Sequence, residues 1–269
     1  MAVTDARQRE PDGACPASWR PPTRREIWRR PLPHLGCADR ALARLSSYFA
    51  LSQFSAIGGL EHVRSSADPF ILALNHATRA EALALPPLLV FEREGKLVHF
   101  FADWNFQMIP GIGLLYRRSG AIVVTRKSAR PAFLNYLKPL FTPSVPVIEQ
   151  ARTLLATGRS LAIFVEGTVN RDPARLLRGR LGAARLSLET AAPVVPAGIA
   201  AVTGAAGRRQ LALAIGPPLY PDRHRRDGSG GSYSTNDVRE WHSKIMCEIA
   251  RLSGKTWQPS SQENNHETR

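Results

Sequence analysis

The chain has few cysteines, and they form no pattern that a disulfide framework or a zinc site requires. Cys15, Cys37 and Cys247 are odd in number and far apart, and no C-x-x-C pair occurs in the 269 residues. We expect them to be free thiols of a cytoplasmic protein. Aromatic residues make up only 7% of the chain and do not alternate with basic residues, which argues against a stacking platform for nucleic acid.

The sequence also lacks a secretory signal and a convincing membrane span. Its first residues carry charges and include no apolar core segment. The uncharged stretch 45–60 is short for a bilayer and contains four serines, and 190–207 is interrupted by prolines and glycines. Two interpretations of the N-terminal region stay open. Residues 20–30 and 42–60 either associate peripherally with the inner face of a membrane or form a flexible arm and a packed helix.

Acidic residues are scarce relative to basic ones. The chain has 36 Lys and Arg against 22 Asp and Glu, a net charge of +14. Such a charge favours anionic partners, namely nucleic acid, an acidic lipid surface or a phosphorylated substrate. Most of the basic residues are arginines, whose planar guanidinium suits bidentate phosphate contacts. With 43% hydrophobic residues, the chain can bury one sizeable core.

Short apolar runs alternate with amphipathic ones, which predicts a single α/β domain with a mixed, mostly parallel sheet flanked by helices. The predicted strands are 70–74, 97–101, 121–124, 160–165, 193–199 and 210–215. The predicted helices are 40–54, 80–93, 146–157, 181–190 and 238–252. We expect residues 1–38 to form a flexible basic arm, 39–253 the folded domain and 254–269 a disordered tail.

Polar, reactive residues follow several predicted strands. His76 follows the first, Arg126 the third and Glu166 the fourth. Since ligands bind at the carboxyl ends of strands in open α/β sheets, these groups could share one crevice. If His76 lies on the turn and Glu81 on the first helical turn, the carboxylate can orient the imidazole as a base. Alternatively, His76 caps a turn and Glu81 is a solvated helix residue.

Four ordered blocks extend this interpretation. The chain resembles the glycerolipid acyltransferases of the 1-acylglycerol-3-phosphate acyltransferase (lysophospholipid acyltransferase) family over residues 55–220. Asn75-His76 with Glu81 is similar to the family's N-H-x4-D block, and residues 120–126 (GAIVVTR) to its G-x-I-F-I-x-R block. Residues 164–168 (FVEGT) resemble F-P-E-G-T, and 193–196 (PVVP) resemble the proline-flanked fourth block. The basic run 178–188 lies between the third and fourth blocks, as is usual in the family.

Two positions depart from the family pattern. Glu81 stands where the family has aspartate, so the carboxylate is kept but its geometry toward His76 must adjust. Val165 replaces the proline of the third block, which frees a backbone angle and adds an N–H without removing a reacting group.

The resemblance implies a glycerolipid acyltransferase-like fold and direct transfer of a fatty acyl group from acyl-CoA or acyl-carrier protein. The acceptor would be a lysophospholipid, 1-acyl-glycerol-3-phosphate in particular, and neither metal nor cofactor would take part. His76 would be the general base and Glu81 its orienting partner. The substrate-binding set implied by the blocks is Asn75, Gly120, Arg126, Glu166, Gly167 and Thr168. Arg126 would bind the acceptor phosphate.

Three other functions remain to be compared with this one. The acceptor could lack a glycerophosphate, as in an ornithine lipid, a glycolipid or a specialised metabolite. A serine hydrolase of the α/β type is disfavoured because no G-x-S-x-G elbow occurs. A non-enzymatic nucleic-acid-binding protein would explain the positive charge, but the scarcity of aromatic residues argues against it.

Overall fold

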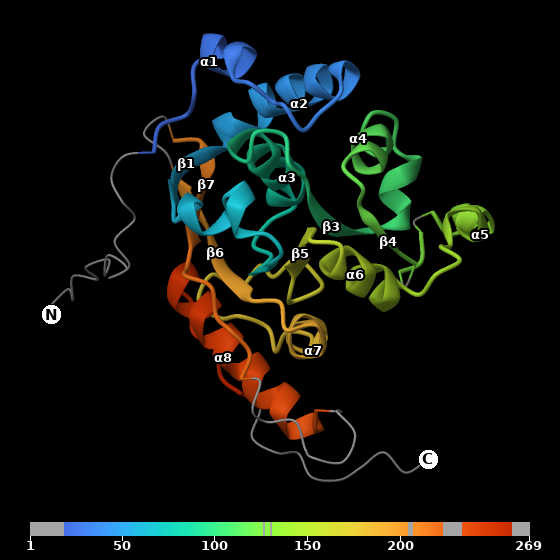
Figure 1. The fold of residues 1–269 in the computed structure, drawn as a ribbon, viewed down its shortest axis with the longest axis vertical. Coiled ribbons are helices and arrows are strands. Elements are labelled where there is room, and N and C mark those ends of the chain that lie inside the picture. Colours follow the sequence, from blue (N-terminus) through green and yellow to red (C-terminus); the bar gives the residue numbers. More distant parts are fainter. Residues whose placement is uncertain (1–18, 126, 130, 204–206, 223–232, 260–269) are drawn as a thin grey trace, which may run out of the picture.

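The computed structural model describes residues 19–125, 127–129, 131–203, 207–222 and 233–259. These residues form a seven-stranded sheet in the order β1-β7-β6-β2-β5-β3-β4 (Figure 1). The strands are β1 (Phe54–Gly58), β2 (Ile71–Leu74), β3 (Val98–Asp103), β4 (Ile122–Val124), β5 (Ser160–Phe164), β6 (Val194–Thr203) and β7 (Arg209–Ile215). β6 and β7 pair antiparallel, whereas every other neighbouring pair is parallel. The predicted mixed, mostly parallel sheet is therefore confirmed.

Helices cover both faces of this sheet. The α-helices are α1 (Arg24–Arg29), α2 (Cys37–Ala50), α3 (Ala80–Glu92), α4 (Ile112–Arg118), α5 (Lys138–Phe141), α6 (Val147–Ala156), α7 (Gly182–Thr190) and α8 (Thr235–Ser253). The short 3-10 helices are η1 (Leu51–Gln53), η2 (Leu60–Val63), η3 (Ser65–Ala67), η4 (Trp104–Met108) and η5 (Ala132–Leu137). None of the helices in the described ranges is long and apolar enough to cross a membrane.

The alternation of side chains along β2 divides the core into two layers. Leu72 and Leu74 point to a cluster that includes residues of α2 and α3, whereas Ile71 and Ala73 point to a cluster that includes α6, α7 and α8. All four side chains are buried, which is typical of a parallel strand covered on both faces. Figure 1 shows α2 and α3 on one side of the sheet and α7 and α8 on the other.

Part of the predicted flexible arm, residues 1–38, is a folded helix. Residues 1–18 lie outside the described residues, but Thr23 and Glu26 form a capping box that starts α1. Ile27 is buried in the same core cluster as α3. The pattern of Thr followed three residues later by Glu could have indicated this helix, but the surrounding prolines and arginines obscured it.

The C-terminal tail also differs from the prediction near its start. Gly254 ends α8 in a left-handed conformation, and Thr256 then forms a β-bridge with Arg175. Trp257 packs against the core cluster that contains α8. Residues 254–257 are thus part of the folded domain, while 260–269 lie outside the described residues.

A closed ionic network lies at the amino ends of β2 and β5. Arg93 is 1% exposed and donates to both carboxylate oxygens of Asp68, at 2.7 and 2.8 Å. It also donates to the carbonyl oxygens of Val63 and Arg64. Ser160, the first residue of β5, donates to Asp68 and accepts from the Phe70 N–H, 3.1 Å away. The network thereby holds the starts of the two strands together.

Two prolines inside α3 leave part of its backbone without helical partners. Pro86 has no N–H, so the carbonyl of Ala82 lacks the usual hydrogen bond from four residues further on. The hydroxyl of Tyr116 on α4 approaches this carbonyl at 3.5 Å. The Ala82 carbonyl therefore faces α4, and both Ala82 and Tyr116 line the large cleft of the molecule.

Candidate active site

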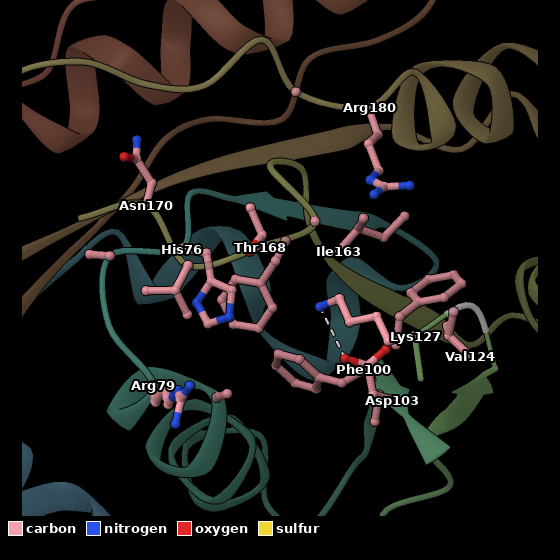
Figure 2. Close-up of a pocket in the computed structure, with 18 of the residues that line it drawn as sticks. His76, Arg79, Phe100, Asp103, Val124, Lys127, Ile163, Thr168, Asn170 and Arg180 are labelled. Atoms are coloured by element: carbon pink, nitrogen blue, oxygen red, sulfur yellow. Dashed lines mark ion pairs between the residues drawn. The ribbon is translucent and has the colours of Figure 1, made fainter. Parts of the chain in front are cut away.

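A large open cleft of about 2810 Å³ runs along the carboxyl ends of β2, β3 and β5. Figure 2 shows side chains from several elements pointing into it, among them His76, Lys127 and Arg180. Its walls combine apolar side chains such as Phe100 and Ile163 with basic ones such as Arg79. The position agrees with the general rule for open α/β sheets. A cleft of this character can take a ligand with both a hydrocarbon and an anionic part.

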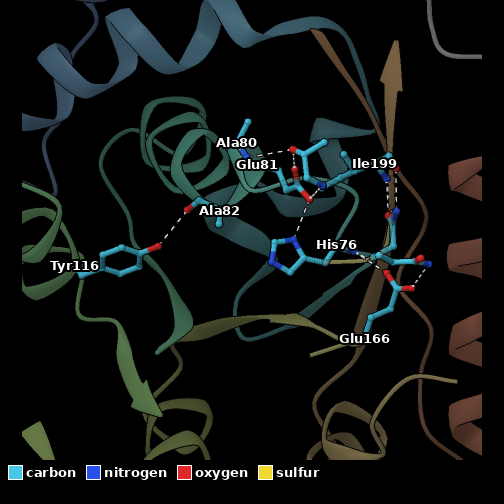
Figure 3. A network of polar contacts seen from close by, with 10 residues as sticks. His76, Ala80, Glu81, Ala82, Tyr116, Glu166 and Ile199 are labelled. Carbon is cyan, nitrogen blue, oxygen red and sulfur yellow. Dashed lines mark hydrogen bonds and ion pairs between the residues drawn. The ribbon is translucent and has the colours of Figure 1, made fainter. Parts of the chain in front are cut away.

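His76 and Glu81 meet as the sequence predicted. His76 lies on the turn after β2, and Glu81 lies in the first turn of α3. The distance between His76 Nδ1 and Glu81 Oε1 is 2.9 Å (Figure 3). The Glu81 side chain is 0% exposed and also accepts from the N–H of Thr78, at 2.6 Å, and from its hydroxyl. The bonding excludes the alternative in which Glu81 is solvated.

The ionisation of Glu81 decides which nitrogen of His76 is free. Burial alone would raise the pKa of the Glu81 carboxyl, but the hydrogen bonds from His76 and Thr78 outweigh it and hold the pKa below its ordinary value. An ionised carboxylate can only accept, so Nδ1 of neutral His76 carries the proton and Nε2 carries the lone pair. The pair therefore has the arrangement of an imidazole oriented as a general base.

The backbone of His76 is clamped from β5. Glu166 Oε2 accepts from the His76 N–H at 2.8 Å, and the His76 carbonyl accepts from the Asn170 N–H at 2.7 Å. Glu166 Oε1 accepts from the Asn170 side chain at 2.7 Å and from the Leu177 N–H at 2.8 Å. The Glu166 carboxylate is buried and all its contacts are internal, so it positions His76, whereas the sequence predicted contact with substrate.

Asn75 also has a structural position. Its side chain is 0% exposed, and it exchanges two hydrogen bonds with the Ile199 backbone on β6: Nδ2 donates at 2.9 Å and Oδ1 accepts at 2.7 Å. A side chain closed off in this way cannot contact a ligand in the cleft. Asn75 therefore fixes the end of β2 to β6, which corrects its expected role in binding substrate.

The remaining predicted residues differ in their placement. Gly167 and Thr168 line the cleft, as expected. Gly120 does not line it. Gly120 precedes β4 with φ +63°, and its carbonyl accepts from Nδ1 of buried His99 at 2.9 Å, so its role is to shape a turn. Arg126 lies outside the described residues, although Thr125 beside it lines the cleft.

Sequence reasoning missed three contributors to the site. Phe164 stacks on the His76 ring, with centroids 4.4 Å apart and planes 24° apart. Asn170 bridges Glu166 and the His76 backbone. The N–H and the hydroxyl of Thr78 both donate to the Glu81 carboxylate. Phe164 stands within the third block, so the block itself was the available signal. The roles of Thr78 and Asn170 depend on turn geometry that no spacing in the sequence reveals.

The described part of the chain shows no set of side chains suited to bind a metal ion. There, no group of three or more His, Cys, Asp or Glu side chains is arranged to hold a metal ion. The side chains that can act chemically at the carboxyl ends of β2 and β5 are the His76 imidazole, the Thr78 and Thr168 hydroxyls and the neighbouring cations. This set suits proton transfer from a hydroxyl next to an anionic group.

Comparison with known proteins places this geometry in a family. A family model described as "Acyltransferase" matches residues 55–200, more than half of the chain. The chain belongs to the acyltransferase family. The matched range contains His76 and Glu81 as well as the cleft-lining Gly167 and Thr168, so the site just described lies within the matched part of this acyltransferase.

A solved structure supports the fold. The chain is similar to the crystal structure of the 1-acyl-sn-glycerophosphate (LPA) acyltransferase PlsC from Thermotoga maritima, with a TM-score of 0.50 and 19% sequence identity. The similarity covers 87% of this chain and 80% of that one. A comparison with curated proteins found no match. The predicted acyltransferase-like α/β fold is thus confirmed.

Proposed function

We propose that this acyltransferase moves a fatty acyl group from acyl-CoA or acyl-carrier protein to the free hydroxyl of a lysophospholipid. The acceptor is 1-acyl-glycerol-3-phosphate, and the product is phosphatidic acid. The observation that carries the proposal is the oriented His76–Glu81 pair at a cleft with both apolar and basic walls. The similarity to a protein titled as an LPA acyltransferase points in the same direction.

In the proposed reaction, Nε2 of His76 takes the proton of the acceptor hydroxyl as its oxygen attacks the thioester carbonyl. The new C–O ester bond forms, the C–S bond breaks, and the leaving thiolate receives the proton from the imidazolium of His76. Glu81 stabilises that imidazolium and keeps the ring oriented. General-base assistance of this kind contributes about 10²–10⁴ in rate. Arg126 of the second block contributes to binding of the acceptor phosphate, because a guanidinium is suited to this anion.

A radiolabelled acyl-CoA assay over a panel of acceptors tests this function. The panel contains lysophosphatidic acid, other lysophospholipids and phosphate-free alcohols, including an ornithine-lipid precursor and a glycolipid. We expect the highest kcat/KM with lysophosphatidic acid, and His76→Ala should abolish transfer while the thermal unfolding midpoint is kept. Preference for a phosphate-free acceptor would overturn the assignment of the acceptor, and near-normal turnover of His76→Ala would overturn the mechanism.

We further propose that the protein reaches its lipid substrate by peripheral association with an anionic membrane surface on the cytoplasmic side. Phe49 on α2 is 64% exposed, and Leu45, one turn earlier, and Trp28 on α1 are also exposed. Basic residues of segment 20–30 flank Trp28 in the sequence. Together these groups fit an anionic interface. Co-sedimentation with anionic vesicles, with DNA as a competitor, tests the proposal, and preferential binding to DNA would contradict it.

A further inference from the structure

The third block contains a glycine whose missing side chain makes room for an arginine. Gly167 follows β5 with φ +66°, and a Cβ built on it would lie 2.3 Å from Nε and 3.2 Å from Cζ of Arg180. The backbone of Arg180 is fixed to the same turn, because its N–H donates to the Val165 carbonyl at 2.7 Å. Any other residue at 167 would therefore displace the guanidinium of Arg180.

The guanidinium of Arg180 is directed into the cleft and has no internal partner. Figure 2 shows it pointing into the cavity. Among the described residues it makes no side-chain hydrogen bond and no ion pair. By contrast, Lys127 in the same cleft pairs with Asp103 at 3.1 Å, and Arg152 pairs with Glu149 and Glu189. A guanidinium held next to the site with its donors unused can take a planar, bidentate anion.

The position of Gly167 ties this arginine to the base. Glu166, its immediate neighbour, holds the His76 N–H, so the turn that admits Arg180 is the same turn that positions the imidazole. The carboxylate of Glu166 does not oppose an anion in the cleft, because it is buried and accepts from three N–H groups. The proposed anion site at Arg180 and the base at His76 are therefore both attached to the turn that follows β5.

We propose that Arg180, admitted by Gly167, binds the phosphate of the acyl acceptor together with Arg126 and so contributes to specificity for phosphorylated acceptors. This proposal rests on the proposed acyl transfer to a lysophospholipid. In 1-acyl-glycerol-3-phosphate the phosphate is attached to the carbon next to the one that bears the reacting hydroxyl. The phosphates of coenzyme A are separated from the thioester by the whole pantetheine arm. An anion site coupled to the His76 turn therefore matches the acceptor better than the donor.

Equilibrium binding in the His76→Ala protein tests the proposal without turnover. The probes are 1-hexanoyl-glycerol-3-phosphate below its micelle concentration, its phosphate-free analogue 1-hexanoyl-glycerol, and coenzyme A, each titrated by calorimetry. We expect Arg180→Ala to weaken binding of the phosphorylated probe by about 10- to 100-fold, the range for a lost charge-assisted pair. Binding of the phosphate-free probe and of coenzyme A should be unchanged, and Arg180→Lys should recover part of the loss.

Arg185 provides the matched control. It is an exposed arginine of the same cleft, located on α7, and no side-chain partner of it is found in the described ranges. Arg185→Ala changes the net charge by the same amount, and we expect less than about twofold loss of affinity, because Arg185 lies on α7 and not at the Gly167 turn. Equal losses in the two variants, or a loss confined to coenzyme A, would overturn the proposal.

A substitution of Gly167 provides an independent test. Gly167→Ala should weaken binding of the phosphorylated probe as Arg180→Ala does. The double variant should lose little more affinity than either single variant, since both changes remove the same contact. Additive losses would contradict the coupling. Thermal unfolding shows whether Gly167→Ala is folded, and the Arg180 variants decide the question if it is not.

The proposed reaction and the role of Arg180 can fail separately. Binding that depends on Arg180 in a protein that fails to acylate lysophosphatidic acid would refute only the proposed reaction. Acylation of lysophosphatidic acid with binding indifferent to Arg180 would refute only the role of Arg180.

Discussion

Two buried polar networks lie at opposite ends of the same pair of strands, β2 and β5. At the amino ends, Arg93 uses its donors on Asp68 and on backbone carbonyls, so the network is closed. At the carboxyl ends, Glu81 and Glu166 are equally saturated, but Nε2 of His76 between them has no hydrogen-bond partner among the residues that the structure describes. Because the carboxylates of Glu81 and Glu166 are occupied by internal donors, they hold the His76 ring in one orientation. Nε2 therefore stays available to a ligand in the cleft.

The amino-end network should affect stability without affecting chemistry. Arg93→Met leaves Asp68 buried without its main partner, so we expect the free energy of unfolding to fall by about 3–5 kcal/mol. The loss should lie near the lower limit, because Lys96 still contacts Asp68 at 2.6 Å. Urea denaturation measures the effect. The exposed pair of Arg251 with Glu248 serves as a control, and Arg251→Ala should cost no more than about 0.5 kcal/mol. A fall in kcat of the folded Arg93→Met enzyme would show that the two ends are not independent.

The carboxyl-end network should show the opposite behaviour. Glu81→Gln removes the charge that orients and stabilises the imidazole, so kcat should fall by about 10²-fold or more, with the acceptor KM little changed. Glu81→Asp keeps a carboxylate and restores the residue that is usual in the family, and it should keep or improve activity. Steady-state kinetics of both variants measure this. If Glu81→Asp were as impaired as Glu81→Gln, side-chain length rather than charge would control His76.

Glu166 separates positioning from substrate binding. Glu166→Gln preserves the shape but replaces one buried acceptor oxygen by an amide, so one N–H loses its partner, and unfolding should become easier by about 1–3 kcal/mol. Because the His76 backbone is then held less firmly, kcat should fall while the acceptor KM stays constant. Thermal denaturation together with kinetics measures both effects. A raised acceptor KM in a fully stable protein would instead support contact with substrate.

The pH dependence of stability sharpens the comparison further. The pKa of Glu81 in the folded protein is below its ordinary value of 4.5, and the unfolded chain has the ordinary value. Its contribution is therefore complete above pH 4.5 and is lost as the pH falls through the lower folded pKa. We expect the stability difference between the wild type and Glu81→Gln to shrink over that acidic range in pH-dependent denaturation. A difference that stayed constant with pH would show that Glu81 is not ionised in the native state.

Much of the fold could be predicted from the sequence because its central strands are continuous apolar runs. The predicted strands 70–74 and 160–165 correspond to β2 and β5, and the amphipathic stripe from Val238 to Leu252 lies within α8. β1 (Phe54–Gly58) was missed because serine, alanine and glycine interrupt its apolar pattern. α4 (Ile112–Arg118) was missed because it is short and lies between glycines.

The site was predictable in its chemistry but not in its division of roles. The spacing of His76 and Glu81 fits a strand, a turn and a helix start, and the structure confirms their contact. Glu166 and Asn75 belong to the same blocks, yet burial gives them backbone partners, and no sequence pattern states which way a side chain points. Arg180 was concealed in a basic run, because its relation to Gly167 depends on a positive φ angle.

The size of the cleft has a consequence for the order of events. At about 2810 Å³ it has room for the acyl donor and the acceptor together, as the proposed direct transfer requires. Initial-rate plots at varied concentrations of both should then give intersecting lines rather than the parallel lines of a double-displacement scheme. Such an enzyme passes through a ternary complex of protein, acyl donor and acceptor, with no covalent acyl-enzyme in between.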